Sequence, residues 1–136
     1  MSLISQIVGK WDFVSSDKFD DYLKEVGVGL VTRKLANNLK PTLEFSIHGD
    51  EWTMISTSTF KTYMTKFQLG KAYDHDTADG RAVTSVYTLE NDKLVQHEKG
   101  RNGGKDSVIE RYIEGGQLVI KCTAGTVTSI RKYAKV

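Results

Sequence analysis

The sequence has little of the residues that cross-link or interrupt a chain: one cysteine, Cys122, and one proline, Pro41. A single cysteine cannot form a disulfide within the chain or build a cysteine-rich zinc site. No apolar run approaches the ~18 residues that a membrane helix needs. The start, MSLISQIVGKW, lacks the basic residues and continuous apolar core of a secretory signal. We therefore expect a soluble protein of the cytoplasm, a reducing compartment.

Charge of one sign is not in excess either. The 19 basic and 17 acidic residues give a net charge of +2. A nucleic-acid-binding domain usually has a concentrated basic face, so we expect no nucleic-acid partner. A chain of 136 residues is long enough for one domain and short for two. We expect one domain over residues 1–136.

Strand-forming residues and turn signals are plentiful. Threonine, valine, isoleucine and tyrosine are frequent, and turns rich in glycine, asparagine or aspartate recur about every ten residues. Examples are HGDE at 48–51, DTADG at 76–80 and EGGQ at 114–117. This pattern predicts an antiparallel meander of one strand, two helices and roughly nine further strands. Closure into a barrel would remove the exposed edges, and a small sandwich is the alternative.

One region, residues 17–41, has helical spacing instead. Its first helix carries an apolar stripe at i, i+3, i+4 and i+7, made of Phe19, Tyr22, Leu23 and Val26. Asp17 is the expected N-cap, and Gly27 or Gly29 ends this helix. A second short helix then carries Leu30, Val31, Lys34, Leu35 and Asn38. Pro41 ends it and restarts the strands.

Two arginines occur in strands near the end of the chain. The alternation in DSVIERYIE places Arg111 on the side of two isoleucines, which predicts that it faces inward. Arg131 and Tyr133 share a face of the last strand, but Lys132 lies on the opposite face, so that strand alone is ambiguous. Arg131 in solvent, or either arginine paired with an internal carboxylate, are the alternatives.

An inward arginine needs an anion. The inward faces of these last strands carry no aspartate or glutamate, and burying an unpaired cation is costly. An external carboxylate would fit, because a guanidinium offers a planar fork to two oxygens and a tyrosine hydroxyl adds a third hydrogen bond. The hydroxyl-rich stretch at 52–67, WTMISTSTFKTYMTKF, favours a hydrated cavity over exposed threonine-rich strands.

Catalytic and metal-binding patterns are weak. The three histidines, His48, His75 and His97, lie in or beside turns and are expected on the surface. Cys122 falls on an apolar face without an obvious activating histidine, so we interpret it as a small wall residue. Serine and threonine are too abundant to nominate a nucleophile, and no metal-ligand cluster stands out. We expect a binding protein and not an enzyme, with no metal and no cofactor.

From about residue 4 to residue 135, the chain resembles the intracellular lipid-binding proteins of the calycin superfamily. It is most like the cytosolic fatty-acid-binding proteins of the heart, adipocyte and brain type. The resemblance begins with GKWDFVSSDKFDDYLKEVGVG and continues through TRKLAN, KPTLEF, STFKTYMTKFQLG and TADGR to the terminal RKY. Each fragment alone is weak, whereas their order and spacing together are specific.

The resemblance implies a ten-stranded antiparallel up-and-down β-barrel, or β-clam, with a helix-turn-helix lid at about 17–39. It implies non-covalent binding and intracellular transport of a long-chain fatty acid such as oleate or palmitate in an internal cavity. The carboxylate-binding trio corresponds to Arg111, Arg131 and Tyr133. Cavity and portal positions correspond to Phe19, Tyr22, Leu23, Val28, Ser56, Phe60, Ala78, Ile109 and Cys122.

The resemblance also implies a monomer that contacts membranes transiently through its lid. A basic trio, Lys24, Arg33 and Lys34, resembles one linked to membrane docking or nuclear import in the family. A retinoid carrier specific for retinoic acid is the alternative ligand class. Two positions depart from the pattern: Glu98 stands where a neutral amide is common, and His75 stands where an acid is common. An inward Glu98 could be an internal counter-ion for Arg111.

Overall fold

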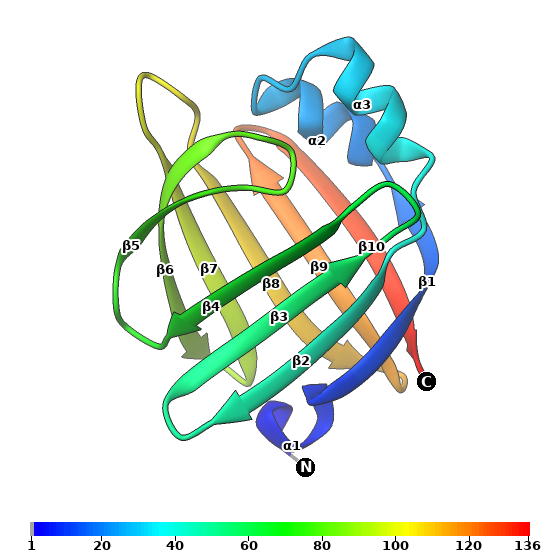
Figure 1. Cartoon of the computed structure of the whole chain (residues 1–136), viewed down its shortest axis with the longest axis vertical. Coiled ribbons are helices and arrows are strands. Elements are labelled where there is room, and N and C mark those ends of the chain that lie inside the picture. The colour runs from blue at the N-terminus through cyan, green and yellow to red at the C-terminus, as the bar shows by residue number, and fades with distance from the viewer. Residues whose placement is uncertain (1) are drawn as a thin grey trace.

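Alternating side chains and tight turns fold most of the chain into antiparallel strands. The computed structural model describes residues 2–136, with ten strands and three helices (Figure 1). The strands are β1 (Gly9–Asp17), β2 (Thr42–His48), β3 (Glu51–Thr57), β4 (Thr62–Gln68), β5 (Tyr73–Asp76), β6 (Ala82–Glu90), β7 (Lys93–Gly100), β8 (Ser107–Glu114), β9 (Gln117–Ala124) and β10 (Val127–Lys135).

The strands form one sheet in the order β4-β3-β2-β1-β10-β9-β8-β7-β6-β5. Every strand pairs with its neighbours in the chain except β4 and β5, which do not pair with each other. In addition, β1 pairs with β10 and joins the two ends of the meander. The sheet curls so that β2–β4 lie across from β6–β9 (Figure 1). This is the predicted up-and-down barrel with a helical lid, and the sandwich alternative is wrong.

Strands β4 and β5 are the two ends of the sheet order, and side chains join them in place of a ladder. The Tyr63 hydroxyl on β4 donates to the Asp76 carbonyl oxygen of β5 at 2.7 Å. The hydroxyls of Thr65 and Tyr73 lie 2.8 Å apart across the same gap. The barrel is therefore closed here by a few side-chain hydrogen bonds, which can open without disrupting a backbone ladder.

The three helices lie at two ends of the barrel. The lid helices α2 (Phe19–Glu25) and α3 (Leu30–Asn37) cover one end, while α1 (Leu3–Ile7) lies beside the other (Figure 1). Helix α1 was not predicted. Both Leu3 and Ile7 are buried, and the Trp11 indole Nε1 donates to the Ile7 carbonyl oxygen at 2.9 Å. Packing of two residues against the barrel thus stabilises a helix too short to form alone.

The lid helices differ from the sequence prediction in two details. Asp17 is not the N-cap of α2: it ends β1, and Lys18 caps the helix with a left-handed φ of 58° and no side-chain cap hydrogen bond. Asn38 is not inside α3: it is the C-cap of this helix. On α3, Leu30 and Val31 are 56% and 84% exposed, so these two side chains are presented to solvent.

The core lies inside the barrel and contains side chains from both ends of the chain. The largest fully buried side chains come from α1, α2 and strands β1, β2, β6, β7 and β9. They include Leu3, Ile7, Trp11, Leu23, Phe45, Tyr87, Leu94 and Leu118. Because α1, β1 and the late strands meet in one core, its burial ties the N-terminal segment to the C-terminal half.

The β7–β8 connection predicts a stability effect at one glycine. A Cβ on Gly100 would lie 2.3 Å from the backbone of Gly104, so we expect Gly100→Ala to destabilise the fold by about 1–3 kcal/mol through overpacking. Gly29→Ala is the matched control: its Cβ meets nothing within 4 Å and its φ of −69° suits alanine. Urea denaturation of both variants measures the difference. If both variants lose an equal, small amount of unfolding free energy, the backbone of the β7–β8 connection can move to accommodate a Cβ, and the prediction is wrong.

Candidate functional site

The register of three neighbouring strands brings the two predicted arginines together. Arg111 on β8 and Arg131 on β10 both pair with Ile120 on β9, which lies between them. Side chains directly opposite in register point to the same face of a sheet. Both arginines are buried, at 6% and 7% exposed, and both line the same internal cavity. The inward orientation predicted for Arg111 is confirmed, and the ambiguity at Arg131 is resolved in the same sense.

Arg111 is only partly satisfied by the protein. Its Nη2 donates to the Gln96 side-chain oxygen at 3.0 Å, and its guanidinium lies 5.7 Å from the centre of the Tyr87 ring. Its Nε and Nη1 are buried and have no hydrogen-bond partner among residues 2–136. Buried donors without acceptors are costly, and these two lie on a cavity wall. They are therefore positioned to receive an anionic group.

Arg131 is held mainly by aromatic rings. Its Nε donates to the Tyr133 hydroxyl at 3.4 Å, and its guanidinium carbon lies 5.0 Å from the Phe13 ring centre and 4.0 Å from that of Phe19. Cation–π contacts orient a guanidinium without using its hydrogen-bond donors. Phe19 is the first residue of lid helix α2, so one lid side chain rests directly on this arginine.

The cavity has a volume of about 280 Å³, near the lower end of the usual range of ligand sites of about 300–1,000 Å³. It brings together nearly all the residues predicted for the cavity and its portal. Those lining it are Phe19, Tyr22, Leu23, Ser56, Phe60, Ala78, Ile109, Arg111, Cys122, Arg131 and Tyr133. Val28 is the exception: it is buried in the core, and the cavity lining does not include it.

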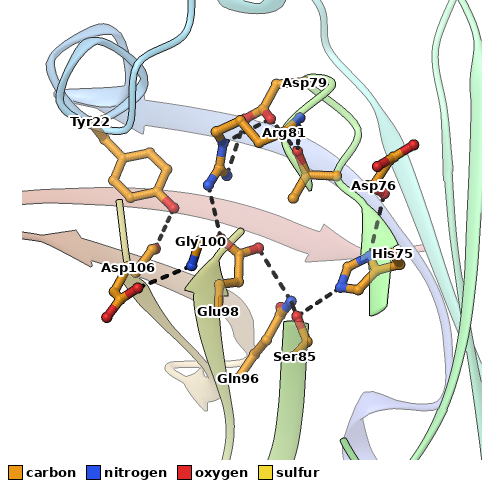
Figure 2. Close-up of polar contacts among 12 residues, drawn as sticks. Tyr22, His75, Asp76, Asp79, Arg81, Ser85, Gln96, Glu98, Gly100 and Asp106 are labelled. Atoms are coloured by element: carbon orange, nitrogen blue, oxygen red, sulfur yellow. Dashed lines mark hydrogen bonds and ion pairs between the residues drawn. The ribbon is translucent and has the colours of Figure 1, made fainter. Parts of the chain in front are cut away.

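A buried polar network of cavity-lining side chains connects Asp79, Arg81, Glu98 and Gln96 (Figure 2). Arg81 donates to both carboxylate oxygens of Asp79, from Nε at 3.0 Å and from Nη2 at 3.3 Å. Its Nη1 donates to Glu98 Oε1 at 3.3 Å. Glu98 Oε2 accepts from the Gln96 amide nitrogen at 3.3 Å, and the Gln96 oxygen accepts from Arg111. Glu98 is thus the ion-pair partner of Arg81, and Gln96 separates it from Arg111.

The charges in this network act on one another. Burial raises the pKa of Glu98, and the Arg81 and Arg111 guanidiniums act against that rise. Burial also disfavours the charged form of Arg81, but Asp79 and Glu98 outweigh it and raise the pKa of Arg81. Sequence reasoning missed Arg81. Arg81 follows the turn in TADGR. Directly after a turn, alternation does not show which face of the strand a residue is on, so its inward orientation could not be predicted.

His75 corrects the prediction of three surface histidines. His48 and His97 are exposed, whereas His75 on β5 lines the cavity. Its Nε2 lies 2.7 Å from the Ser85 hydroxyl (Figure 2). Its Nδ1 lies 3.2 Å from the Tyr63 hydroxyl. Burial is the main cause that lowers the pKa of His75. A neutral imidazole therefore links the β4–β5 gap to the polar network.

The lid is anchored to the barrel by a buried pair of hydroxyls. The Tyr22 hydroxyl on α2 lies 2.5 Å from the Ser107 hydroxyl at the start of β8 (Figure 2). Burial raises the pKa of Tyr22, so this phenol stays neutral through the physiological range. Ser107 pairs with Glu98 across β7 and β8, so the lid anchor and the polar network meet at the same point.

Comparison with known proteins agrees with this geometry. The family model described as the lipocalin / cytosolic fatty-acid binding protein family matches residues 8–136. The chain belongs to this family. It is 46% identical over 133 residues to the adipocyte fatty acid-binding protein of Pygoscelis papua, covering 98% of this chain and 99% of that one. The predicted membership of the intracellular lipid-binding proteins is confirmed. The family is a binding and transport family and not an enzymatic one.

Solved structures of other members of the lipocalin and cytosolic fatty-acid-binding family superpose closely. Caenorhabditis elegans lipid binding protein 8, in its apo form, has a TM-score of 0.95 at 33% identity, covering 100% of this chain and 99% of that one. A Schistosoma mansoni fatty acid binding protein in complex with arachidonic acid has a TM-score of 0.91 at 35% identity, covering 97% of both chains. The barrel and lid are therefore shared.

Two further features bear on this family member's chemistry. Among residues 2–136, no three histidine, cysteine, aspartate or glutamate side chains are grouped so that they could hold a metal ion. Within the same residues, no helix has the length and apolar character that crossing a bilayer requires.

Burial of Cys122 predicts a loss of stability at alkaline pH. Burial raises the pKa of this thiol from 9.0 to about 12. A folded pKa above the unfolded one gives stability that is fully present below pH 9 and is lost as pH rises toward 12. The expected loss from this thiol is up to about 1.4 kcal/mol per pH unit. Urea unfolding of wild type and Cys122→Ala from pH 7 to 11 measures it. The difference in unfolding free energy should narrow above pH 9, and parallel curves would contradict the raised pKa.

Proposed function

We propose that the protein binds a long-chain fatty acid reversibly in its internal cavity and transports it within the cell. In this proposal Arg111, Arg131 and Tyr133 hold the carboxylate. The observation that carries it is the pair of buried Arg111 donors, Nε and Nη1, that have no partner in residues 2–136. One strand, β9, lies between them and Arg131, which is at the same level of the barrel wall. A carboxylate presents two oxygens to such donors, and the Tyr133 hydroxyl adds a third contact.

The hydrocarbon tail and the head group would make different contributions to the binding free energy. Each buried methylene is worth about 0.8 kcal/mol, so a tail of roughly 14 methylenes gives a gross value near 11 kcal/mol. A hydrogen bond to a charged group contributes about 1.5–3 kcal/mol net. Ordering of the tail and displacement of cavity water reduce the gross value. The tail therefore supplies most of the affinity, and the arginines select an acid over an alcohol.

The relatives support this ligand class. One similar protein is named an adipocyte fatty acid-binding protein, and a similar solved structure is a complex with arachidonic acid. Retinoic acid has the same head group and is the competing ligand, which direct competition with oleate separates. No cofactor enters the proposal, because binding and release need only the cavity and its opening.

The lid and the nearby turns are the proposed entrance. Phe60 and Ala78 line the cavity and are exposed, so they lie at its opening. Leu30 and Val31 on the lid are exposed apolar side chains that suit transient contact with a membrane. Of the basic trio, the Arg33 side chain is occupied by Asp20 and the Val28 carbonyl oxygen. A monomer in the cytosol, with nuclear entry, stays a prediction of the family resemblance.

Neutralising Arg131 tests the head-group site. We expect Arg131→Gln to weaken oleate binding at least about ten-fold, the equivalent of one charged hydrogen bond, and to leave oleyl alcohol nearly unchanged. Lys132→Gln is the matched control, because it removes the same charge from the neighbouring residue, whose side chain is exposed. Calorimetric titration of the delipidated proteins gives both affinities, and retinoic acid is titrated alongside.

Equal binding of acid and alcohol by the wild type would overturn the proposed carboxylate site. The same conclusion would follow if Arg131→Gln and Lys132→Gln had equal effects. If retinoic acid binds more tightly than oleate, the proposed carboxylate site would stand, but the ligand would be a retinoid and not a fatty acid.

The membrane contact of the lid has its own test. Val31→Ser should slow transfer of a fluorescent fatty acid to phospholipid vesicles a few-fold, because it removes an apolar side chain that is 84% exposed on α3. Val14→Ser is the control: Val14 is 48% exposed but lies on β1, outside the lid. Transfer rates should differ while affinities stay equal. Equal transfer by the two variants would contradict docking through the lid.

A further inference from the structure

The buried charges of the cavity do not cancel. Five charged side chains that line it are buried or nearly so: the cations Arg81, Arg111 and Arg131, and the carboxylates Asp79 and Glu98. Lys61 also reaches the lining, but it is exposed at the mouth, where its Nζ donates to the Ala78 carbonyl oxygen. Three cations against two carboxylates leave the interior with one excess positive charge.

The contacts of both acids favour the carboxylate form. Asp79 accepts from Arg81 through both of its oxygens. Glu98 likewise accepts through both, from Arg81 at Oε1 and from Gln96 at Oε2. Burial raises the pKa of Glu98, and the Arg81 and Arg111 guanidiniums act against that rise. The neighbouring titratable groups add no charge near pH 8, since burial lowers the pKa of His75 and raises those of Tyr22 and Cys122.

We propose that Glu98 is a specificity-determining residue that restricts the site to amphiphiles with a single negative charge. By pairing with Arg81, it leaves a net charge that one monoanionic head group neutralises. A doubly charged head group, such as a phosphate monoester, would leave the closed cavity with a net negative charge. This inference rests on the proposed function, because it concerns the same head-group site, and it adds the charge that the ligand carries.

Glu98 also positions Arg111, through the side chain of Gln96. The Gln96 amide nitrogen donates to Glu98 and to the Ser85 hydroxyl, at 3.3 and 3.1 Å. Both acceptors fix the orientation of the amide, so that its oxygen faces Arg111 Nη2 at 3.0 Å. Arg111 is thereby held with Nε and Nη1 free, which suits a single compact anion.

Removing one charge at position 98 should change this selectivity. Glu98→Gln keeps the shape of the side chain and raises the excess charge of the interior from one to two. One extra charge at about 10 Å, in a medium of intermediate permittivity, corresponds to a change of about ten-fold in relative affinity. The double variant Arg81→Gln/Glu98→Gln also lacks the Arg81–Glu98 ion pair, but its interior again has one excess positive charge.

The test uses two amphiphiles that differ in charge and share a tetrahedral head group: tetradecyl sulfate, a monoanion, and tetradecyl phosphate. Calorimetry is performed at pH 8, where a phosphate monoester carries close to two negative charges. Myristate is titrated in parallel to report carboxylate binding. Wild type should prefer the sulfate, Glu98→Gln should shift about ten-fold toward the phosphate, and the double variant should regain the preference of the wild type.

The outcomes separate the two proposals. Myristate binding with no shift in Glu98→Gln would overturn the role of Glu98 and leave the proposed function intact. The same holds if the double variant keeps the selectivity of Glu98→Gln, because local damage and not charge would then be the cause. Absence of myristate binding in wild type would overturn both. If Glu98→Gln fails to fold, the double variant must still prefer the sulfate, and Arg81→Gln alone must bind myristate more weakly.

Discussion

Burial of two guanidinium groups on one inner wall of the barrel is the constraint around which the rest of the site is arranged. Arg111 and Arg131 are each less than a tenth exposed, and among residues 2–136 neither forms an ion pair. Desolvating such cations without a partner is unfavourable, and aromatic rings and one amide oxygen offset only part of that cost. This uncompensated cost is the physical basis of the proposal that an anionic head group occupies the cavity.

The parts of the barrel around the two arginines are held by different kinds of contact, which is consistent with the proposed entrance at the lid. The strands that carry the arginines lie in the middle of the continuous sheet, where backbone ladders on both sides hold them. The lid depends on a few contacts, among them Tyr22 with Ser107 and Phe19 over Arg131. The gap is closed by Tyr63 and Tyr73. Local opening of the lid or of this gap would leave the backbone ladders that hold Arg111 and Arg131 intact.

Sequence patterns predicted the architecture well because period-two alternation and turn residues are local signals. Arg111 could be placed inside from its own strand, whereas Arg131 could not, since both faces of its strand carry a cation. The register of β8, β9 and β10, which sets the two arginines on either side of Ile120, depends on pairing between strands. The suggestion that Glu98 is the counter-ion of Arg111 was wrong for the same reason, because its partner, Arg81, lies on another part of the chain. Inward orientation follows from alternation, but nearness to Arg81 depends on how the chain turns at Gly80.

Local sequence patterns also failed to predict features that depend on tertiary contacts. Helix α1 forms because Leu3 and Ile7 are buried against the barrel, which no spacing over five residues reveals. His75 looked like a turn residue, but the short strand β5 turns it into the cavity.

The order of strands in the sheet has a consequence for how the chain could be rewired. Its two ends are β4 and β5, which are consecutive in the chain, while β1 and β10, far apart in the chain, are paired. A circular permutant that joins the termini and opens the β4–β5 turn would run β5 to β10 and then β1 to β4. Every strand would then pair with its neighbour in sequence, and the longest loop closure of the fold would become a local hairpin. Folding rate rises as contacts become more local. The permutant should therefore fold faster, because its β1–β10 pairing is local, and no residue of the cavity wall is changed.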